Sequence, residues 1–446
     1  MAAIMHRTAG TPTDIDKCTW SLWLKRGQLT TTAGECFFGT ETAPGYIQYR
    51  FGPTATTNQI RMEAAGVDGG GFEYLTNRLF RDTSAWYHIV IAQDSTQAAA
   101  GDRVKLYING VQETSFATQT NWQLNSGNPY NASGAVQTIG SYGATSNLFS
   151  GCMSHFHFID GTQYAASDFG SFDATSGIWK INTGPSVTYG NNGFFLKMED
   201  RTNLDLDSSP NAHTFTTTGT VTATYDNPSN NFMTMNPIDN EEQVSIFTTG
   251  NTTVEWTINN KNNFTNFAMN KGKFYWEMKY DCTSGGAQGM IGISKEEGRQ
   301  ADNYPGHDTS AWSYYAGDGN TYHSGGSSYG DSWTTNDIIG VAFDADTRTL
   351  WFSKNGTWQN SATIAEIAAG TTTNAAYTGM GTAGKYFFPC MSGYNDNIAE
   401  FNFGNGYFGT TAVASTNADD AGIGSFEYDV PSGFYALCTK NIKAYG

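Results

Sequence analysis

The stretches VKLYINGVQETSF (104–116) and LWFSKNGTWQNSA (350–362) share one pattern: an alternating apolar and polar run, an Asn-Gly pair, and a second run. A two-residue type I′ turn needs positive φ at both central positions, which Asn tolerates and Gly adopts freely. In the first stretch Val104, Leu106 and Ile108 share one face at a period of two. The pattern therefore predicts a β-hairpin around Asn109-Gly110, with the residues that flank this pair facing each other across the two strands.

The second stretch predicts a hairpin around Asn355-Gly356. Leu350 and Phe352 share one face of its first run. Trp351 lies on the other face with Ser353. The returning run brings Trp358 opposite Ser353 and diagonal to Trp351, a spacing at which large side chains interact.

Composition favours strands throughout the chain. Charged residues make up 15%, aromatic residues 14%, and there are 51 glycines, while Thr, Ser, Asn and Gly fill the intervals between apolar runs. Helical periodicity is nearly absent, and SATIAEIAAG (361–370) is the main candidate for a helical turn. We expect an all-β protein.

The net charge and the cysteine content limit which partners the protein can bind and indicate the cellular compartment in which it is made. A net charge of −17 argues against a nucleic-acid surface, since phosphate binding needs clustered Lys and Arg, and it disfavours anionic lipid. No apolar run is long enough to span a membrane, so we expect no membrane insertion. MAAIMHRTAG lacks the apolar core of a signal peptide, so we expect the protein to be made in a cytoplasm. The six cysteines form no CxxC pair, which favours buried free thiols and leaves a disulfide open.

Turn residues separate short strand candidates at fairly regular intervals in both halves, which is typical of β-sandwiches. We predict one sandwich over 1–215 and a second, with a C-terminal extension, over 271–446. The residues between them, 216–270, are predicted to form a connector partly packed on the second domain. The polar stretch 207–240, which contains three prolines, is interpreted as following the surface and not as core.

Several motifs in the first half resemble the laminin-G/concanavalin-A-like lectin superfamily: WSLWLKRG, DTSAWYHIVIAQD, RVKLYINGVQ and FSGCMSHFHFIDG. Motifs in the second half are similar to SPRY (B30.2-like) domains: GKFYWEMKY, GMIGIS, IIGVAFDADTRTLWFSKNG, FFPCMS and AEFNFG. These resemblances imply two tandem β-sandwiches, a concanavalin/LamG-like jelly roll followed by a SPRY-like sandwich.

The two halves together, with DNPSNNFMTMNP between them and VPSGFYALCTKN near the end, resemble structural proteins of tailed bacteriophages. That resemblance implies a virion protein on the particle surface, in a tail fibre, an appendage or a capsid decoration. It also implies other virion proteins as partners and contact with a host-surface glycan or protein. Adhesion through many weak sites would gain from repeated copies, so we expect a homo-oligomer. The chain has no fibre shaft, coiled-coil heptads or collagen-like repeat, which favours a globular appendage, tip or decoration.

Catalysis is not expected. Glycan hydrolysis on this type of sandwich needs two carboxylates facing one cleft, and some families carry them as Glu-x-Asp-x-x-Glu. The fragment EYDVPS (427–432) lacks the final Glu, and KMEDRTNLDLD (197–207) has other spacing. Two alternatives stay open: a glycan-degrading depolymerase on a concanavalin-like fold, and a cellular SPRY scaffold that recognises peptides.

Histidines and loop aspartates are weak metal candidates. His88 is interpreted as a packed strand residue, while His155 and His157 share a face at a period of two and are interpreted as surface or interface residues. No cofactor is predicted, but loop carboxylates could hold calcium, with Asx turns as the preferred interpretation. The calcium candidates are Asp94, Asp102 and Asp160.

Aromatic loops are the main candidates for ligand binding, because sugars are held by aromatic faces together with amides and carboxylates on loops. Two stretches qualify, 302–333 and 119–134. Core packing of Trp312 and Tyr314 in AWSYY, or subunit packing, is the competing interpretation. The predicted ligand-binding residues are Trp312, Tyr314, Tyr315, Asp318, Tyr322, Tyr329, Trp122 and Tyr130.

Overall fold

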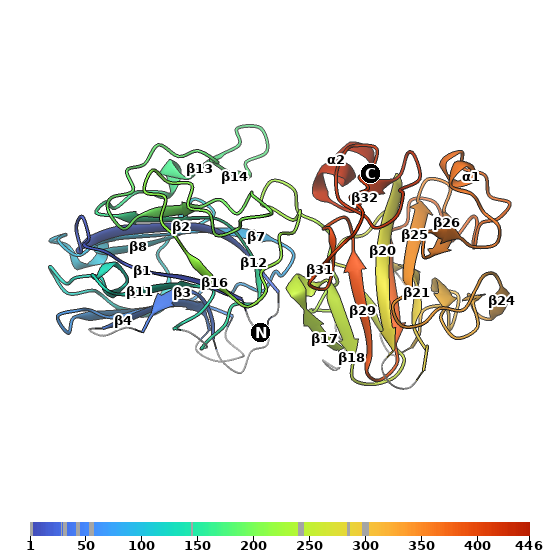
Figure 1. Ribbon diagram of the computed structural model, residues 1–446, viewed down its shortest axis with the longest axis horizontal. Coiled ribbons are helices and arrows are strands. Elements are labelled where there is room, and N and C mark those ends of the chain that lie inside the picture. Colours follow the sequence, from blue (N-terminus) through green and yellow to red (C-terminus); the bar gives the residue numbers. More distant parts are fainter. Residues whose placement is uncertain are drawn as a thin grey trace. The chain divides into compact units, whose positions relative to one another are not determined.

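The computed structural model describes residues 3–446 except 28, 30–33, 42–44, 53–57, 144–145, 240–244, 283–285 and 297–302. It divides into two compact units, Met1–Ala223 and Thr224–Gly446, each built mainly from antiparallel strands (Figure 1). The chain is therefore all-β, with two tandem β-sandwiches.

Two large sheets form the first unit. The eight-stranded sheet has the order β10 (Phe116–Thr120), β6 (Gly71–Thr76), β5 (Ile60–Ala65), β4 (Tyr46–Phe51), β3 (Glu35–Thr40), β11 (Val136–Ile139), β1 (Ile4–Thr8) and β16 (Thr216–Thr218). The six-stranded sheet has the order β15 (Phe194–Leu196), β12 (Gly151–Asp160), β2 (Lys17–Arg26), β7 (Trp86–Asp94), β8 (Val104–Ile108) and β9 (Val111–Glu113).

The core of the first unit lies between these sheets. Alternate residues of each strand point inward, as Trp20, Leu22 and Leu24 do on β2, and all three are fully buried. The Trp20 ring stacks on Phe38 of the other sheet, with ring centroids 5.1 Å apart. Large aromatic side chains from both sheets thus fill the space between them.

Residues 161–192 cover the outer face of the six-stranded sheet, and we call them the first covering segment. They contain the hairpin of β13 (Gly170–Phe172) and β14 (Trp179–Ile181), which lies over β2 and β8 in Figure 1. Phe169 packs there against Val90 and Ile159, which point away from the main core. This sheet is consequently buried on both faces.

The second unit repeats the two-sheet plan. One sheet has the order β17 (Ser245–Thr248), β18 (Thr253–Trp256), β29 (Asn397–Asn402), β20 (Lys273–Cys282), β25 (Ile338–Asp344), β26 (Thr349–Lys354) and β27 (Thr357–Trp358), with β32 (Tyr435–Ala436) also paired to β20. The other has the order β19 (Lys261–Phe264), β28 (Phe387–Gly393), β21 (Met290–Lys295), β22 (Ala311–Tyr315), β23 (Asn320–Tyr322) and β24 (Gly326–Ser328). Smaller elements are β30 (Tyr407–Phe408) with β31 (Thr411–Ala412), α1 (Ile364–Ala368) and α2 (Thr439–Tyr445).

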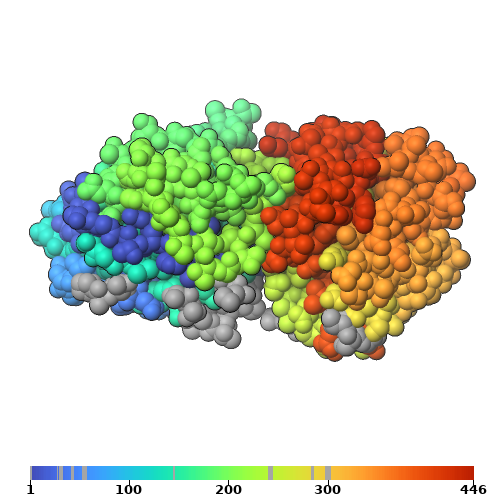
Figure 2. Space-filling model, in the orientation of Figure 1, coloured from blue at the N-terminus to red at the C-terminus, as the bar shows by residue number. Residues whose placement is uncertain are grey.

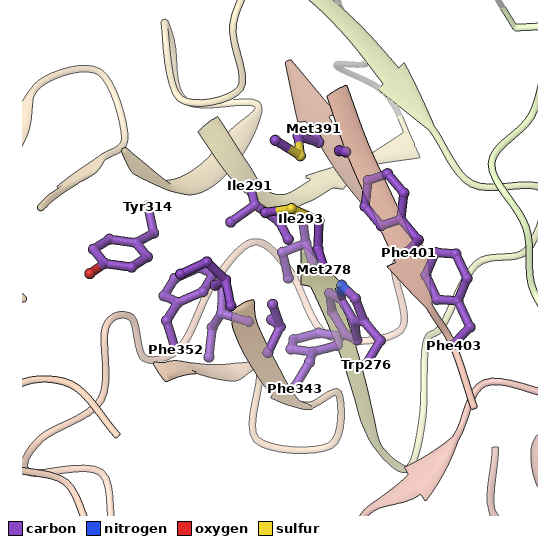
Figure 3. Packing of buried hydrophobic residues seen from close by; sticks show 14 of the residues in the cluster. Trp276, Met278, Ile291, Ile293, Tyr314, Phe343, Phe352, Met391, Phe401 and Phe403 are labelled. Atoms are coloured by element: carbon purple, nitrogen blue, oxygen red, sulfur yellow. The ribbon is translucent and has the colours of Figure 1, made fainter. Parts of the chain in front are cut away.

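Figure 3 shows the core of the second unit, where Trp276 and Met278 of β20 point toward Ile291 and Ile293 of β21. These four side chains are fully buried. The alternate residue Tyr275 points the other way, into a separate apolar cluster. The strand therefore has two buried faces.

Residues 413–438 supply the cover for that second face, and we call them the second covering segment. Phe426 and Phe434 pack against Tyr275, Trp351 and Trp358 on the outside of the sheet. Figure 2 shows these C-terminal residues, in red, against the orange residues that precede them. Each unit thus has a two-sheet sandwich and a C-terminal segment that covers the outside of one sheet.

Both predicted hairpins are confirmed. Ile108 pairs with Val111 across Asn109-Gly110, and Ser353 pairs with Trp358 across Asn355-Gly356. All four turn residues have positive φ, between 49° and 81°. The helical turn expected within 361–370 is α1.

The predicted connector differs from the observed structure. Part of 216–270 forms strands of both units, because β16 pairs with β1 while β17, β18 and β19 join the sheets of the second unit. Met233 and Met235, in the stretch interpreted as surface chain, are fully buried in a core. The polar residues and prolines around these two methionines led to the interpretation of the whole stretch as surface chain.

The cysteines are all free thiols, four buried and two partly exposed. Burial raises the pKa of the Cys36 thiol to about 12, so this side chain stays protonated. Neither described helix has the length and hydropathy needed to cross a bilayer.

Candidate functional site

Five of the eight predicted ligand-binding residues are core residues, which corrects that prediction. Tyr314 and Tyr130 have no exposed surface, and the others are 1–8% exposed. A side chain with so little accessible surface cannot contact a ligand without rearrangement of the core. The five are Trp312, Tyr314, Tyr329, Trp122 and Tyr130.

Strand alternation explains the two buried residues of AWSYY. Trp312 and Tyr314 lie on the inward face of β22, and the Tyr314 ring centroid is 5.3 Å from that of Phe352 (Figure 3). Tyr329 is the third buried candidate of the stretch 302–333, and its hydroxyl accepts a hydrogen bond from the Phe352 amide at 3.1 Å. Core packing, the competing interpretation of AWSYY, is the correct one.

The loop 119–134 turns inward instead of outward. The Trp122 ring lies 4.8 Å from Phe72, and the Tyr130 ring lies 5.7 Å from Trp20. Asn128 holds this loop, since its amide donates to Gln93 at 2.6 Å and its side-chain oxygen accepts from the Tyr130 amide at 2.8 Å. Aromatic content alone did not distinguish an exposed loop from a loop that seals the end of a sandwich.

The three remaining residues come together on the outside of the six-stranded sheet of the second unit. Tyr315 ends β22 and Tyr322 ends β23, and their rings meet edge to face with centroids 5.6 Å apart. The Tyr322 hydroxyl donates to Asp318 Oδ2 at 2.9 Å, and the Asn320 amide donates to the same oxygen at 2.8 Å. The Tyr315 hydroxyl donates to Gln288 Oε1. We call these five residues the tyrosine patch.

The tyrosine patch combines partly exposed rings with a fixed carboxylate and two amides. Asp318 is exposed, while Tyr315, Asn320 and Tyr322 are half-buried. Burial raises the pKa of Tyr322, and the hydrogen bond to the Asp318 carboxylate adds to the rise. Each hydroxyl donates its one hydrogen within the patch, so its oxygen can still accept a hydrogen bond from a neutral polar ligand.

Sequence reasoning did not identify Gln288 and Asn320 as members of this patch. Asn320 could have been found, because Asp-x-Asn at 318–320 fits an Asx turn that fixes the amide beside the carboxylate. Gln288 is far from the other members in sequence and reaches Tyr315 only because β21 pairs with β22. No local signal marks it.

Three of the histidines, His88, His155 and His157, are buried in the first unit, and His88 and His157 contact the first covering segment. His88 is packed, as predicted: its Nδ1 accepts from the Trp179 indole at 2.9 Å and its Nε2 meets Ser21 Oγ at 2.9 Å. Burial lowers the pKa of His88 to about 3, so the ring is neutral.

The structure corrects the interpretation of His155 and His157 as surface or interface residues. They are 7% and 2% exposed, because His157 packs against Phe169 and Tyr189 of the first covering segment and His155 packs against Phe195 of β15. The His157 ring stacks on Phe195 and its Nδ1 lies 3.0 Å from the Tyr189 hydroxyl. A β-bulge gives His155 a φ of 49°. Within the described residues, no three His, Cys, Asp or Glu side chains gather to hold a metal.

The calcium candidates have other partners. Asp160 is buried and accepts hydrogen bonds from the Thr13 and Asn192 amides at 2.7 and 3.0 Å. Asp94 caps its own turn by accepting from the Thr96 amide, and exposed Asp102 pairs with Lys105. The Asx-turn interpretation thus fits Asp94.

One pair of carboxylates faces across neighbouring strands of the first unit. Glu63 of β5 pairs directly with Glu73 of β6, and Arg61 Nη2 contacts one at 2.7 Å and the other at 3.0 Å. The Arg61 guanidinium thus bridges the two carboxylates on this sheet.

Comparison with known proteins assigns a family to the main part of each unit. Residues 6–166 match the Concanavalin A-like lectin/glucanases superfamily. Residues 273–406 match the SPRY domain family. The two units are thus a concanavalin A-like sandwich and a SPRY sandwich. The first covering segment lies mostly beyond the first match, and the second lies wholly beyond the second.

Among curated proteins, Ran-binding protein 9 of Xenopus laevis is 34% identical to this chain over 88 residues. Ran-binding protein 10 of Danio rerio is 33% identical over the same length. These alignments cover 19% of this chain, and 16% and 14% of the two relatives. The aligned part is therefore a small fraction of each relative.

Solved structures with local similarity include SPRY domains. The SPRY domain of human HERC1 is 18% identical, with a TM-score of 0.30, over 37% of this chain and 96% of that one. The TRIM65 PSpry domain is 11% identical, with a TM-score of 0.30, over 38% of this chain and 91% of that one.

Proposed function

We propose that this chain is a non-enzymatic binding protein of a bacteriophage particle, exposed as an appendage or decoration, and that its tyrosine patch contacts a host-surface glycan. The observation that carries the ligand class is the meeting of Tyr315, Asp318 and Tyr322 on one accessible surface. Sugars present apolar C–H faces and hydroxyl groups, which match aromatic rings and a carboxylate with amides. The placement on a phage rests on the sequence motifs near 226–237 and 431–441.

Many weak contacts would make such a protein effective. A shallow patch of this kind binds a single sugar weakly, whereas copies repeated on a particle raise avidity by orders of magnitude. We therefore propose a homo-oligomer held among other virion proteins. In this role the chain holds a surface polysaccharide and does not cleave it.

Glycan-array binding by the full-length protein tests the ligand class. We expect Tyr315→Ala and Tyr322→Ala each to weaken binding about tenfold, the loss typical of a central aromatic contact. Tyr386→Ala is the matched control, because Tyr386 is an exposed tyrosine of the same unit at 46% exposure and lies outside the patch. Equal binding by all three variants would show that the patch is not the site.

A cellular SPRY scaffold that recognises peptides is the second candidate, favoured by the similarity to Ran-binding proteins over 88 residues. Binding of peptides, but not glycans, through the same tyrosines would favour it. Release of reducing ends from bacterial polysaccharide, abolished by a carboxylate substitution, would instead establish a depolymerase. Labelling the protein on intact particles tests the virion location.

A further inference from the structure

The second unit contains a hollow of about 560 Å³ between helix α1 and the second covering segment. This volume falls within the range of pockets that bind ligands. Ile364, Ala365 and Ala368 line it from α1, and Asn417, Asp429 and Val430 line it from the covering segment. The hollow is separate from the tyrosine patch, with which it shares no residue.

One wall of the hollow is apolar. Ile364 and Ala368 lie one helical turn apart and therefore share a face of α1. Ile364 is 38% exposed and so presents apolar surface to the hollow that it lines. A ligand with an apolar group would remove this surface from water.

The surroundings of the hollow are acidic without counter-charges. Glu366 of α1 accepts from the Thr363 amide at 2.8 Å, Asp420 from the Ser432 hydroxyl at 2.9 Å, and Glu427 from the Ala414 amide at 2.6 Å. These donors are neutral, and across the described residues neither these carboxylates nor Asp429 form a recorded ion pair.

The sequence explains the missing counter-charges. Residues 355–384 and 386–439, which include every residue that lines the hollow, contain no Lys, Arg or His. Lys273, whose Nζ lies 5.6 Å from the Phe434 ring centroid, pairs with Asp344 at 3.6 Å. The negative potential around the hollow is therefore not neutralised by the segments that build it.

We propose that this hollow binds an extended, positively charged segment of a partner protein, in which an aliphatic side chain lies beside a lysine or arginine. The aliphatic group would pack on Ile364 and Ala368, and the cation would approach Asp429 and Glu427. Charge complementarity of this kind mainly supplies specificity and association rate, while the apolar contact supplies affinity. This interaction does not depend on glycan binding by the tyrosine patch.

Selection of random dodecapeptides against the immobilised full-length protein tests the proposal. We expect the enriched peptides to carry Lys or Arg next to Leu, Ile, Val or Met. One enriched peptide is then synthesised with a fluorophore, and its binding is measured by anisotropy at low and at physiological salt. Ile364→Ser should weaken binding about tenfold, and Asp429→Asn should reduce the salt dependence.

The matched controls are Ile258→Ser, since Ile258 is also 38% exposed in this unit, and Asp346→Asn, an exposed acid away from the hollow. Both should bind as the unsubstituted protein does. If Ile364→Ser does not fold, Ala365→Arg on the exposed face of α1 should abolish binding by placing a cation at the hollow.

Acidic or uncharged enriched peptides, no enrichment, or full binding by the Ile364 and Ala365 variants would overturn the proposal. Displacement of the peptide by millimolar calcium, without any effect of Ile364→Ser, would assign the hollow to a cation instead. Loss of glycan binding in the tyrosine variants with peptide binding intact would show that the two sites are independent.

Discussion

At the scale of single residues, Glu277 is the least expected feature of the chain. It lies in the middle of β20 with no exposed surface, and its carboxylate accepts four hydrogen bonds. Tyr275 and the Tyr428 amide donate to one oxygen at 3.0 and 2.9 Å. Asn402 and the Glu427 amide donate to the other at 3.1 and 2.9 Å. This residue thus fastens the second covering segment to the sheet.

We expect Glu277→Gln to destabilise the second unit by about 1–3 kcal/mol, although it removes a buried charge, because the new amide group would face two donors and leave them unpaired. Urea unfolding followed by tryptophan fluorescence measures the change. Glu255→Gln on β18 of the same sheet, at a partly exposed position, serves as control and should change stability by less than about 0.5 kcal/mol. Equal effects would show that the four hydrogen bonds contribute little.

At the scale of elements, the two Asn-Gly hairpins have a second role that the turn chemistry does not reveal. A Cβ on Gly110 would collide with the Trp179 ring, and a Cβ on Gly356 would lie 2.6 Å from the Tyr428 ring. Each turn is therefore a place where the covering segment of its unit approaches the backbone. The device occurs twice because each sandwich needs a tight turn under its cover.

Gly356→Ala should cost about 2–4 kcal/mol, the sum of a left-handed backbone without glycine and a steric clash with Tyr428. Gly370→Ala separates the two contributions, because Gly370 has a φ of 74° and open space around it. That control should cost only about 1–2 kcal/mol. Thermal unfolding of both variants gives the comparison, and indistinguishable losses would contradict a role for Tyr428.

At the scale of the whole molecule, buried histidines of the first unit and a buried glutamate of the second have pKa shifts that make their contributions to stability depend on pH in opposite ways. In the first unit burial lowers the pKa of His88 to about 3, and it also lowers the pKa of His155 and His157. The unfolded chain then binds more protons than the folded one below about pH 6.5, so stability falls as pH decreases. In the second unit burial raises the pKa of Glu277 to about 7, so its contribution is largest in acid and is lost as pH rises from about 4.5 through 7.

We therefore expect acidification from pH 7.5 to 5 to weaken the first unit relative to the second. Hydrogen exchange resolved by peptide, on the full-length protein, reports each unit separately. His88→Gln should flatten the response of the first unit, because glutamine cannot be protonated at this position. A parallel response of both units, or a first unit that strengthens in acid, would contradict the assignment.

The sequence by itself determined the strands, the two hairpins and the two sandwich families, because period-two alternation and Asn-Gly turns act over a few neighbouring residues. The sequence did not determine which sheets are covered on both faces. Residues such as Trp312, Tyr130 and His157 looked available because the segments that cover them lie far away in the chain or turn inward at the end of a sheet. Only the tertiary structure decided that Tyr315, Asp318 and Tyr322 stay accessible and meet, since their contact depends on the pairing of β22 with β23. Whether a strand residue is buried depends on the segment that packs against it. When that segment is distant in the chain, the local sequence does not identify it.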